Sequence, residues 1–139
     1  RFFEYLNDDE RAGYSKAIEK RVSKFGPLKL SISGLGGFPH IKKPRVLWIG
    51  LKPAERIREL FALLEEAAVE AGLPLEKRPL KPHITIARVK MPDSLRNTQK
   101  ALESVRISET EHNWNLLQLM DSVLGQKGAE HTPVALWKL

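Results

Sequence analysis

The stretch KPHITIARVK, from Lys81 to Lys90, largely alternates polar and apolar side chains after its proline. Successive side chains of a β-strand point to opposite faces, so His83 and Thr85 share one face while Ile84 and Ile86 share the other. The isoleucines suit an apolar core. The stretch therefore predicts a strand whose open face carries an imidazole and a hydroxyl about 6–7 Å apart between Cα atoms.

Helices and strands alternate around this strand. Asn7 is predicted to cap a helix with Glu10 as its reciprocal partner, and Gly26 to end that helix. A longer helix is predicted from Pro53 to about Ala71, and a shorter one after Pro92. Alternating or apolar runs predict further strands at Leu28–Ile32, Arg45–Leu51, Trp114–Leu124 and Pro133–Leu139.

Two segments are less regular. Arg1–Leu6 is predicted to be the end of a strand, and Gly34–Pro44 to be a loop. The glycines of this loop lack the Gly-Lys-Ser/Thr ending of a phosphate-binding loop, so we expect only a flexible turn.

The order of elements predicts an α+β fold with antiparallel or mixed sheets. We expect two similar lobes, each a small, mostly antiparallel sheet with helices on its outer face. A length of 139 residues fits one domain, which we take to span residues 1–139.

The charge balance favours a polyanionic partner. The chain has a formal net charge of +6 and a pI of about 9.7, and basic side chains near phosphates release counterions. A basic surface without any role in nucleic-acid binding is the alternative. No cysteine is present, which excludes disulfides and thiolate metal sites and favours a reducing, cytoplasmic setting. No apolar run could cross a bilayer, so no membrane association is expected.

His83 and Thr85 suit phosphate chemistry, because imidazole exchanges protons near neutral pH and a hydroxyl can hold a phosphoryl oxygen. A lone His-x-Thr is common by chance, however, and such a histidine is more often simply exposed or hydrogen-bonded. Arg88 lies on the isoleucine face by strict alternation, but a bulge near the strand end would turn it toward His83. Its forked guanidinium would then suit a phosphate.

Longer runs carry a more specific signal. RPLKPHITIARVK (residues 78–90) and SGLGGFPHIKKPRVLWIGL (residues 33–51) resemble the RNA 2′,3′-cyclic phosphodiesterases, or 2′-5′ RNA ligase-like proteins, of the 2H phosphoesterase superfamily. SVLGQKGAEHTPVALWKL (residues 122–139) resembles the closing hairpin of that family. The resemblance implies two lobes around a central cleft, each with one His-x-Thr-x motif.

This sequence contains only one such motif. None of His40, His112 and His131 is followed by threonine two residues later. Arg1–Phe3 resembles the residues that follow the first motif of the family. We therefore expect that the N-terminal strand and first motif are missing here, and that about forty residues precede Arg1 in the intact protein. Without a His-x-Thr directly before Arg1, the two-histidine mechanism would be lost.

The resemblance implies hydrolysis of RNA 2′,3′-cyclic phosphate ends to 2′-phosphates, together with reversible 2′-5′ RNA ligation. His83 would accept a proton from water, the upstream histidine would protonate the leaving oxygen, and Thr85 would stabilise the phosphorane charge. Neither a cofactor nor a metal is implied. The expected partner is RNA or an oligonucleotide with a 2′,3′-cyclic phosphate end, bound by a monomer.

Further binding residues follow from their positions. Lys81 and Arg88 flank the motif and are predicted to hold the terminal phosphate. Phe2 or Phe3 is predicted to stack on the terminal base, with core packing the better prediction for at least one of them. Trp48 is expected in the core.

The basic residues after Phe38 are candidates for contact with the RNA strand, and a solvated basic loop is the alternative. They are Lys42, Lys43 and Arg45. For the whole chain the alternatives are a non-catalytic RNA-binding module on the same fold, or a basic domain that binds another protein.

Overall fold

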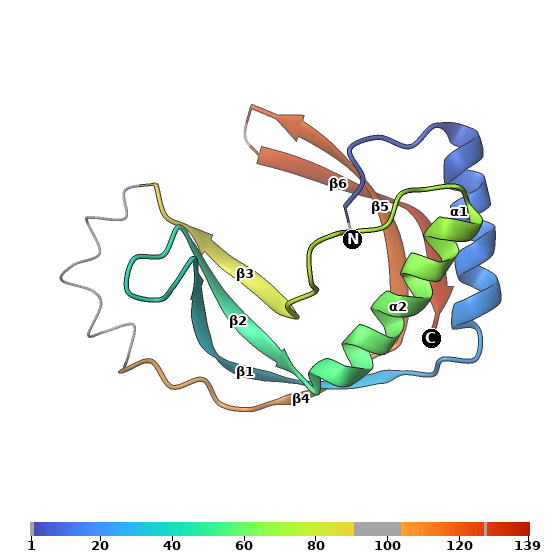
Figure 1. The fold of residues 1–139 in the computed structure, drawn as a ribbon. Helices are drawn as coiled ribbons and strands as arrows, with labels where there is room; N and C mark the ends of the chain where they lie inside the picture. The colour runs from blue at the N-terminus through green and yellow to red at the C-terminus, as the bar shows by residue number, and fades with distance from the viewer. Residues whose placement is uncertain (1, 91–103, 127) are drawn as a thin grey trace. The chain divides into compact units, whose positions relative to one another are not determined.

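Two helices and six strands make up the described part of the chain, which comprises residues 2–90, 104–126 and 128–139 of a computed structural model (Figure 1). The described residues form two compact units. Unit 1 lies within residues 1–28, 56–80 and 113–139, and unit 2 within residues 29–55 and 81–112. Neither helix is long and apolar enough to cross a membrane.

Helix α1 (Asp8–Val22) begins at the capping box that the sequence predicts. The Asn7 side chain accepts a hydrogen bond of 2.9 Å from the Glu10 amide, and the Glu10 carboxylate accepts one of 2.9 Å from the Asn7 amide. These bonds satisfy two amides that have no partner within the helix. Gly26, at φ 80°, follows the end of α1 and supplies a backbone conformation that favours glycine.

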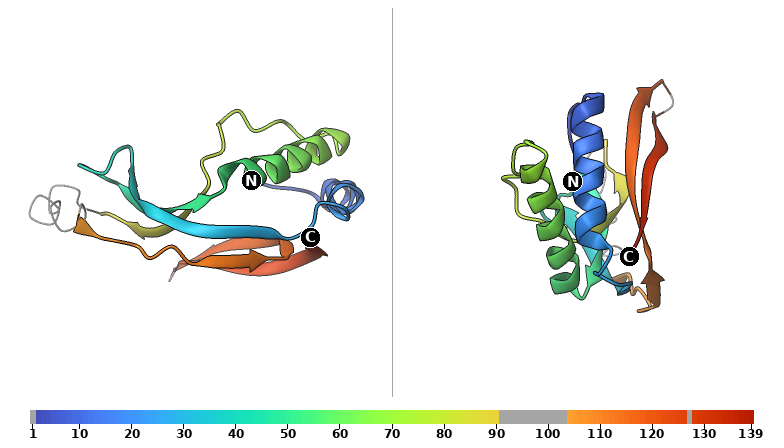
Figure 2. Two further views of the ribbon diagram at one scale, coloured as in Figure 1. Left: turned by 90° about the horizontal axis from the view of Figure 1, so that it is seen from below. Right: turned by 90° about the vertical axis from the view of Figure 1, so that its right-hand side faces the viewer.

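Helix α2 (Ala54–Glu70) runs beside α1 (Figure 2). All of α2 belongs to unit 1 except its first two residues. Ile18, Val22, Ala67 and Ala68 of the two helices are buried. The Arg21 guanidinium binds the Glu70 carboxylate at 2.5 Å, so a basic residue of α1 is paired with an acidic residue of α2.

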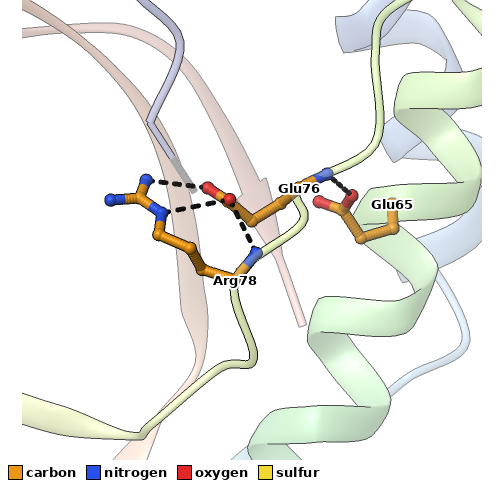
Figure 3. Close-up of polar contacts among 3 residues, drawn as sticks. All are labelled: Glu65, Glu76 and Arg78. Atoms are coloured by element: carbon orange, nitrogen blue, oxygen red, sulfur yellow. Dashed lines mark hydrogen bonds and ion pairs between the residues drawn. The ribbon is translucent and has the colours of Figure 1, made fainter.

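The residues after α2 are held by side chains rather than by regular structure (Figure 3). The Glu76 amide donates a hydrogen bond of 2.7 Å to the Glu65 carboxylate on α2. Arg78 in turn donates through Nη2 and Nε to the Glu76 carboxylate, at 2.9 and 3.1 Å. This chain of contacts fixes the connection that leads toward the His-x-Thr strand.

Unit 1 also contains the C-terminal hairpin, formed by β5 (Leu116–Gly125) and β6 (Gly128–Lys138). β6 contacts α1. The register shifts between Leu119 and Met120, which pair with Ala135 and Pro133. The bulge allows a proline within the strand, since proline cannot donate to a ladder.

The sheet of unit 2 has the strand order β3-β2-β1-β4, with β1 (Leu28–Phe38) and β3 (His83–Arg88) both antiparallel to β2 (Val46–Lys52). Figure 1 shows β1, β2 and β3 side by side. The edge strand β4 (Glu111–Trp114) was not predicted. Leu30 and Leu47 are buried, on the side opposite to Ser33 and Gly50.

The α+β class with antiparallel sheets is confirmed, two details differ, and one prediction is not tested. Gly34–Phe38 belongs to β1 and is not a loop, because a bulge at Gly34 (φ 42°) lets Leu35–Phe38 continue the ladder with β2. Residues 2–6 are irregular and do not end a strand; Phe3 instead packs edge-on against Tyr14, at 5.2 Å. The helix predicted after Pro92 lies outside the described residues.

The Arg21–Glu70 pair predicts a loss of stability in acid. The hydrogen bond from Arg21 is the main cause that holds the pKa of Glu70 below its ordinary value of 4.5. A lowered pKa contributes stability above that ordinary value, and the contribution is lost as the pH falls through the folded-state pKa. We expect Glu70→Gln to lower the melting temperature at pH 7, and the difference from wild type to shrink at about pH 3. Calorimetry at both pH values, with the exposed Glu19→Gln as control, would contradict this if the difference stayed constant.

Alanine substitutions at two glycines are predicted to change the free energy of unfolding in opposite directions. A Cβ atom at Gly36 would lie 2.2 Å from the Trp48 ring, whereas one at Gly13, within α1, would lie 3.9 Å from its nearest neighbour. We expect Gly36→Ala to reduce the free energy of unfolding by about 1–3 kcal/mol through overpacking. Gly13→Ala should increase it by about 0.5–1 kcal/mol, because alanine loses less backbone entropy in a helix. Urea denaturation measures both, and equal effects would show that the contact at Gly36 is unimportant.

Candidate active site

One face of the β1–β2–β3 sheet gathers the side chains selected from the sequence. Residues directly opposite each other in an antiparallel pair point to the same side. The ladder therefore places on one side three rows of residues, each running from β1 through β2 to β3: Ser33–Gly50–His83, Gly36–Trp48–Thr85 and Phe38–Val46–Arg88. We call this side the His83 face.

Arg88 lies on the His83 face because β3 contains a bulge. Thr85 and Ala87 pair with neighbouring residues of β2, which leaves Ile86 as the extra residue. The extra residue shifts the alternation by one, so Arg88 lies opposite Val46 on the same side as Thr85. The expectation that Ile86 faces the core is wrong, since its side chain is 52% exposed.

The His83 imidazole is half-buried between aromatic rings. Its centroid lies 5.1 Å from that of the Phe38 ring, edge to face at 83°, and 6.0 Å from that of the Trp48 ring. The His83 Nδ1 lies 2.6 Å from the carbonyl oxygen of Lys81. A carbonyl oxygen can only accept a hydrogen bond, so Nδ1 carries the hydrogen and the neutral ring keeps its lone pair on Nε2. His83 is thus held in the tautomer that takes a proton at Nε2.

Glycines make room for these neighbours. The Trp48 ring lies against Gly36, where a Cβ would approach it to 2.2 Å. The Ser33 hydroxyl lies over Gly50, where a Cβ would lie 2.7 Å from Oγ. Trp48 is half-buried on the His83 face, so the expectation that it belongs to the core is wrong.

Positive charge accompanies the aromatic rings. The Lys81 ammonium lies 5.5 Å from the centroid of the Phe38 ring, within the range of a cation–π contact. The exposed Thr85 and Arg88 share the face with His83. Of the predicted site residues, His83, Thr85, Arg88 and Lys81 thus lie together in unit 2.

The other predicted binding residues are less closely tied to His83. Phe2 belongs to unit 1, is 86% exposed, and lines a pocket together with Phe3 and Leu75. Its proposed stacking on a base stays a prediction.

The basic residues after Phe38 lie in unit 2 and are exposed. They are Lys42, Lys43 and Arg45. The Lys43 amide donates to the His40 carbonyl and to His40 Nδ1, at 3.3 and 3.2 Å, so a local turn presents this loop. Contact of these residues with RNA stays a prediction.

Several residues of the face were not selected as site residues from the sequence, among them Ser33, Phe38 and Lys52. Strand alternation already places Lys52 on the side of Trp48, and Ser31 lies opposite Lys52. To place these residues of β1 and β2 beside His83, one needs the register in which β1, β2 and β3 pair, and a single sequence does not determine that register. Lys52 is paired with Glu109, whose carboxylate lies 2.6 Å from its ammonium.

Solved structures share this fold. LigT of E. coli, in a crystal structure with 3′-AMP, matches with a TM-score of 0.72 at 21% identity, over 100% of this chain and 74% of LigT. The protein TT0787 of Thermus thermophilus matches with a TM-score of 0.70 at 24% identity, over 97% of this chain and 73% of that one. At such identities the likeness concerns the fold.

Three curated relatives carry the name RNA 2′,3′-cyclic phosphodiesterase. The Aquifex aeolicus protein is 33% identical over 86% of this chain, and the Archaeoglobus fulgidus protein 32% identical over 80%. That of Geobacillus stearothermophilus is 38% identical over 52% of this chain. The match covers 64%, 63% and 23% of these three relatives, respectively, so the chain spans less than two thirds of each.

The family comparison agrees with the fold and with the relatives. The family described as the 2′-5′ RNA ligase superfamily matches residues 3–121, which include all the strands of the His83 face. The chain therefore belongs to the 2′-5′ RNA ligase superfamily.

Proposed function

We propose that the protein hydrolyses RNA 2′,3′-cyclic phosphate ends to 2′-phosphates and that His83 is the proton acceptor of this reaction. The observation that carries the proposal is the hydrogen bond of 2.6 Å from His83 Nδ1 to a backbone carbonyl, which leaves Nε2 as a base. Family membership and the names of the relatives support the choice of substrate.

The proposed reaction is an in-line displacement at phosphorus. A water oxygen forms a bond to the phosphorus, and the bond from phosphorus to the ribose O3′ breaks. His83 Nε2 takes the proton from the water, and a general acid gives a proton to O3′. The products are a 2′-phosphate and a 3′-hydroxyl. In 2′-5′ ligation, the 5′-hydroxyl of a second RNA would take the place of water in the same displacement.

Neighbouring side chains would neutralise the charge that builds on the phosphoryl oxygens. Thr85, two residues from His83 on the same face, can donate a hydroxyl hydrogen bond. Arg88 offers a forked guanidinium, and Lys81 adds a second cation. Phe38 and Trp48 restrict the imidazole, which keeps its base in one position.

The general acid belongs to a further proposal. By resemblance to the family it would be the histidine of a first His-x-Thr-x motif. A non-catalytic RNA-binding module is the second candidate, and the observation that favours it is the single His-x-Thr-x motif in this sequence.

Replacing His83 tests the proposed base. We expect His83→Ala in the intact protein to reduce kcat for a 2′,3′-cyclic nucleotide by about 10²–10⁴-fold, the usual contribution of one acid or base. The measurement is the steady-state rate of formation of the 2′-phosphate product at saturating substrate.

The control is His131→Ala. His131 is exposed in the hairpin of unit 1 and bonds to Ser122. Full activity of His83→Ala would contradict the proposed role, and loss of activity in both variants with loss of fold would show a structural effect instead. Retained RNA binding without turnover by the wild-type protein would favour the non-catalytic module.

A further inference from the structure

A second group of polar side chains lies on the His83 face, at the end opposite to Arg88. Lys52 follows Gly50 by two residues on β2, about 7 Å along the strand. Gly50 is the direct neighbour of His83, whereas Arg88 lies in the other direction, opposite Val46. The face therefore carries cations on both sides of the imidazole.

Hydroxyl groups accompany Lys52. Ser31 lies directly opposite it on β1, and Ser33 lies opposite Gly50. Because Gly50 has no side chain, the Ser33 hydroxyl can lie over its backbone, and a Cβ there would approach Oγ to 2.7 Å. Two hydroxyls and an ammonium thus occupy adjoining rows beside His83.

The charge of this region is uneven. Strands β1, β2 and β3 contain no aspartate or glutamate, and no acidic residue occurs anywhere between Leu28 and Ala54. The carboxylate beside Lys52 is that of Glu109, which precedes β4. Side chains of this pair are 47% and 62% exposed, and exposed pairs of this kind are worth about 0–1 kcal/mol. An incoming dianion can therefore replace Glu109 at little energetic cost.

We propose that Lys52 and Ser33 form a second phosphate subsite, which binds the 5′-phosphate of the nucleotide whose cyclic phosphate lies at His83. The inference rests on the proposed function and specifies its substrate. Lys52 lies two strand residues, about 7 Å, from the row that contains both Ser33 and His83, a spacing that suits the next phosphate along a nucleic-acid strand. The protein then prefers a nucleotide that continues in the 5′ direction over an isolated nucleoside cyclic phosphate.

A pair of substrates that differ by one phosphate tests the subsite. These are adenosine 2′,3′-cyclic phosphate and its 5′-phosphorylated form, compared by kcat/KM in the intact protein at low salt. We expect the 5′-phosphate to raise kcat/KM by about tenfold, the effect of one charge-assisted hydrogen bond. Lys52→Ala should bring this ratio close to one, and Glu109→Gln should increase it, because the competing carboxylate is removed.

Other variants separate the subsite from general electrostatics and from folding. Lys16→Ala, in α1 of unit 1, removes the same charge and should leave the ratio at its wild-type value. Lys52→Arg should keep most of the preference. If the Lys52–Glu109 pair is only structural, Lys52→Ala and Glu109→Gln will both lower the melting temperature and leave the ratio unchanged, which overturns the inference.

The two proposals fail in different ways. Absence of hydrolysis of either substrate by the wild-type protein refutes the proposed function. Hydrolysis of both substrates at equal kcat/KM keeps the proposed function and refutes the second subsite.

Discussion

The pairing of β2 with both of its neighbours is the constraint on which the site depends. β2 contributes only one cation to the His83 face, yet its register with β1 and β3 decides which side chains lie together. Two bulges adjust that register, at Gly34 and at Ile86. Without the second bulge, Arg88 would point to the opposite side. Two glycines of the same sheet, Gly36 and Gly50, leave room for Trp48 and Ser33.

The chemistry follows from what this register brings together. A backbone carbonyl fixes the tautomer of His83, and aromatic rings hold the imidazole on two sides. Cations and hydroxyls lie on both sides of that base, whereas strands β1, β2 and β3 carry no carboxylate. A base held in one orientation, next to groups that favour negative charge, suits attack on a phosphate ester. This face therefore carries part of the excess positive charge that gives the chain its net charge of +6.

Local signals in the sequence predicted much of this structure. The capping box at Asn7 and Glu10, the end of α2 close to Ala71, and the shared face of His83 and Thr85 all depend on neighbours in the chain. Features that depend on partners distant in sequence were not predictable. Gly34–Phe38 forms a strand only because β2 pairs with it, and the face of Arg88 depends on a bulge that alternation cannot reveal. Trp48 was assigned to the core because its strand is apolar, but the bare backbone of Gly36 receives its ring on the open side.

The most direct test is an NMR titration of the intact protein with adenosine 2′-phosphate, which resembles the product of the proposed reaction. Ligand binding at the His83 face predicts saturable shifts of the His83 imidazole and of the Thr85 and Arg88 signals, with little change at Leu47 on the opposite side of the sheet or at His131 in the hairpin. Shifts confined to His131 and the α1 residues, with the His83 imidazole unaffected at saturation, would contradict the assignment of this face as the active site.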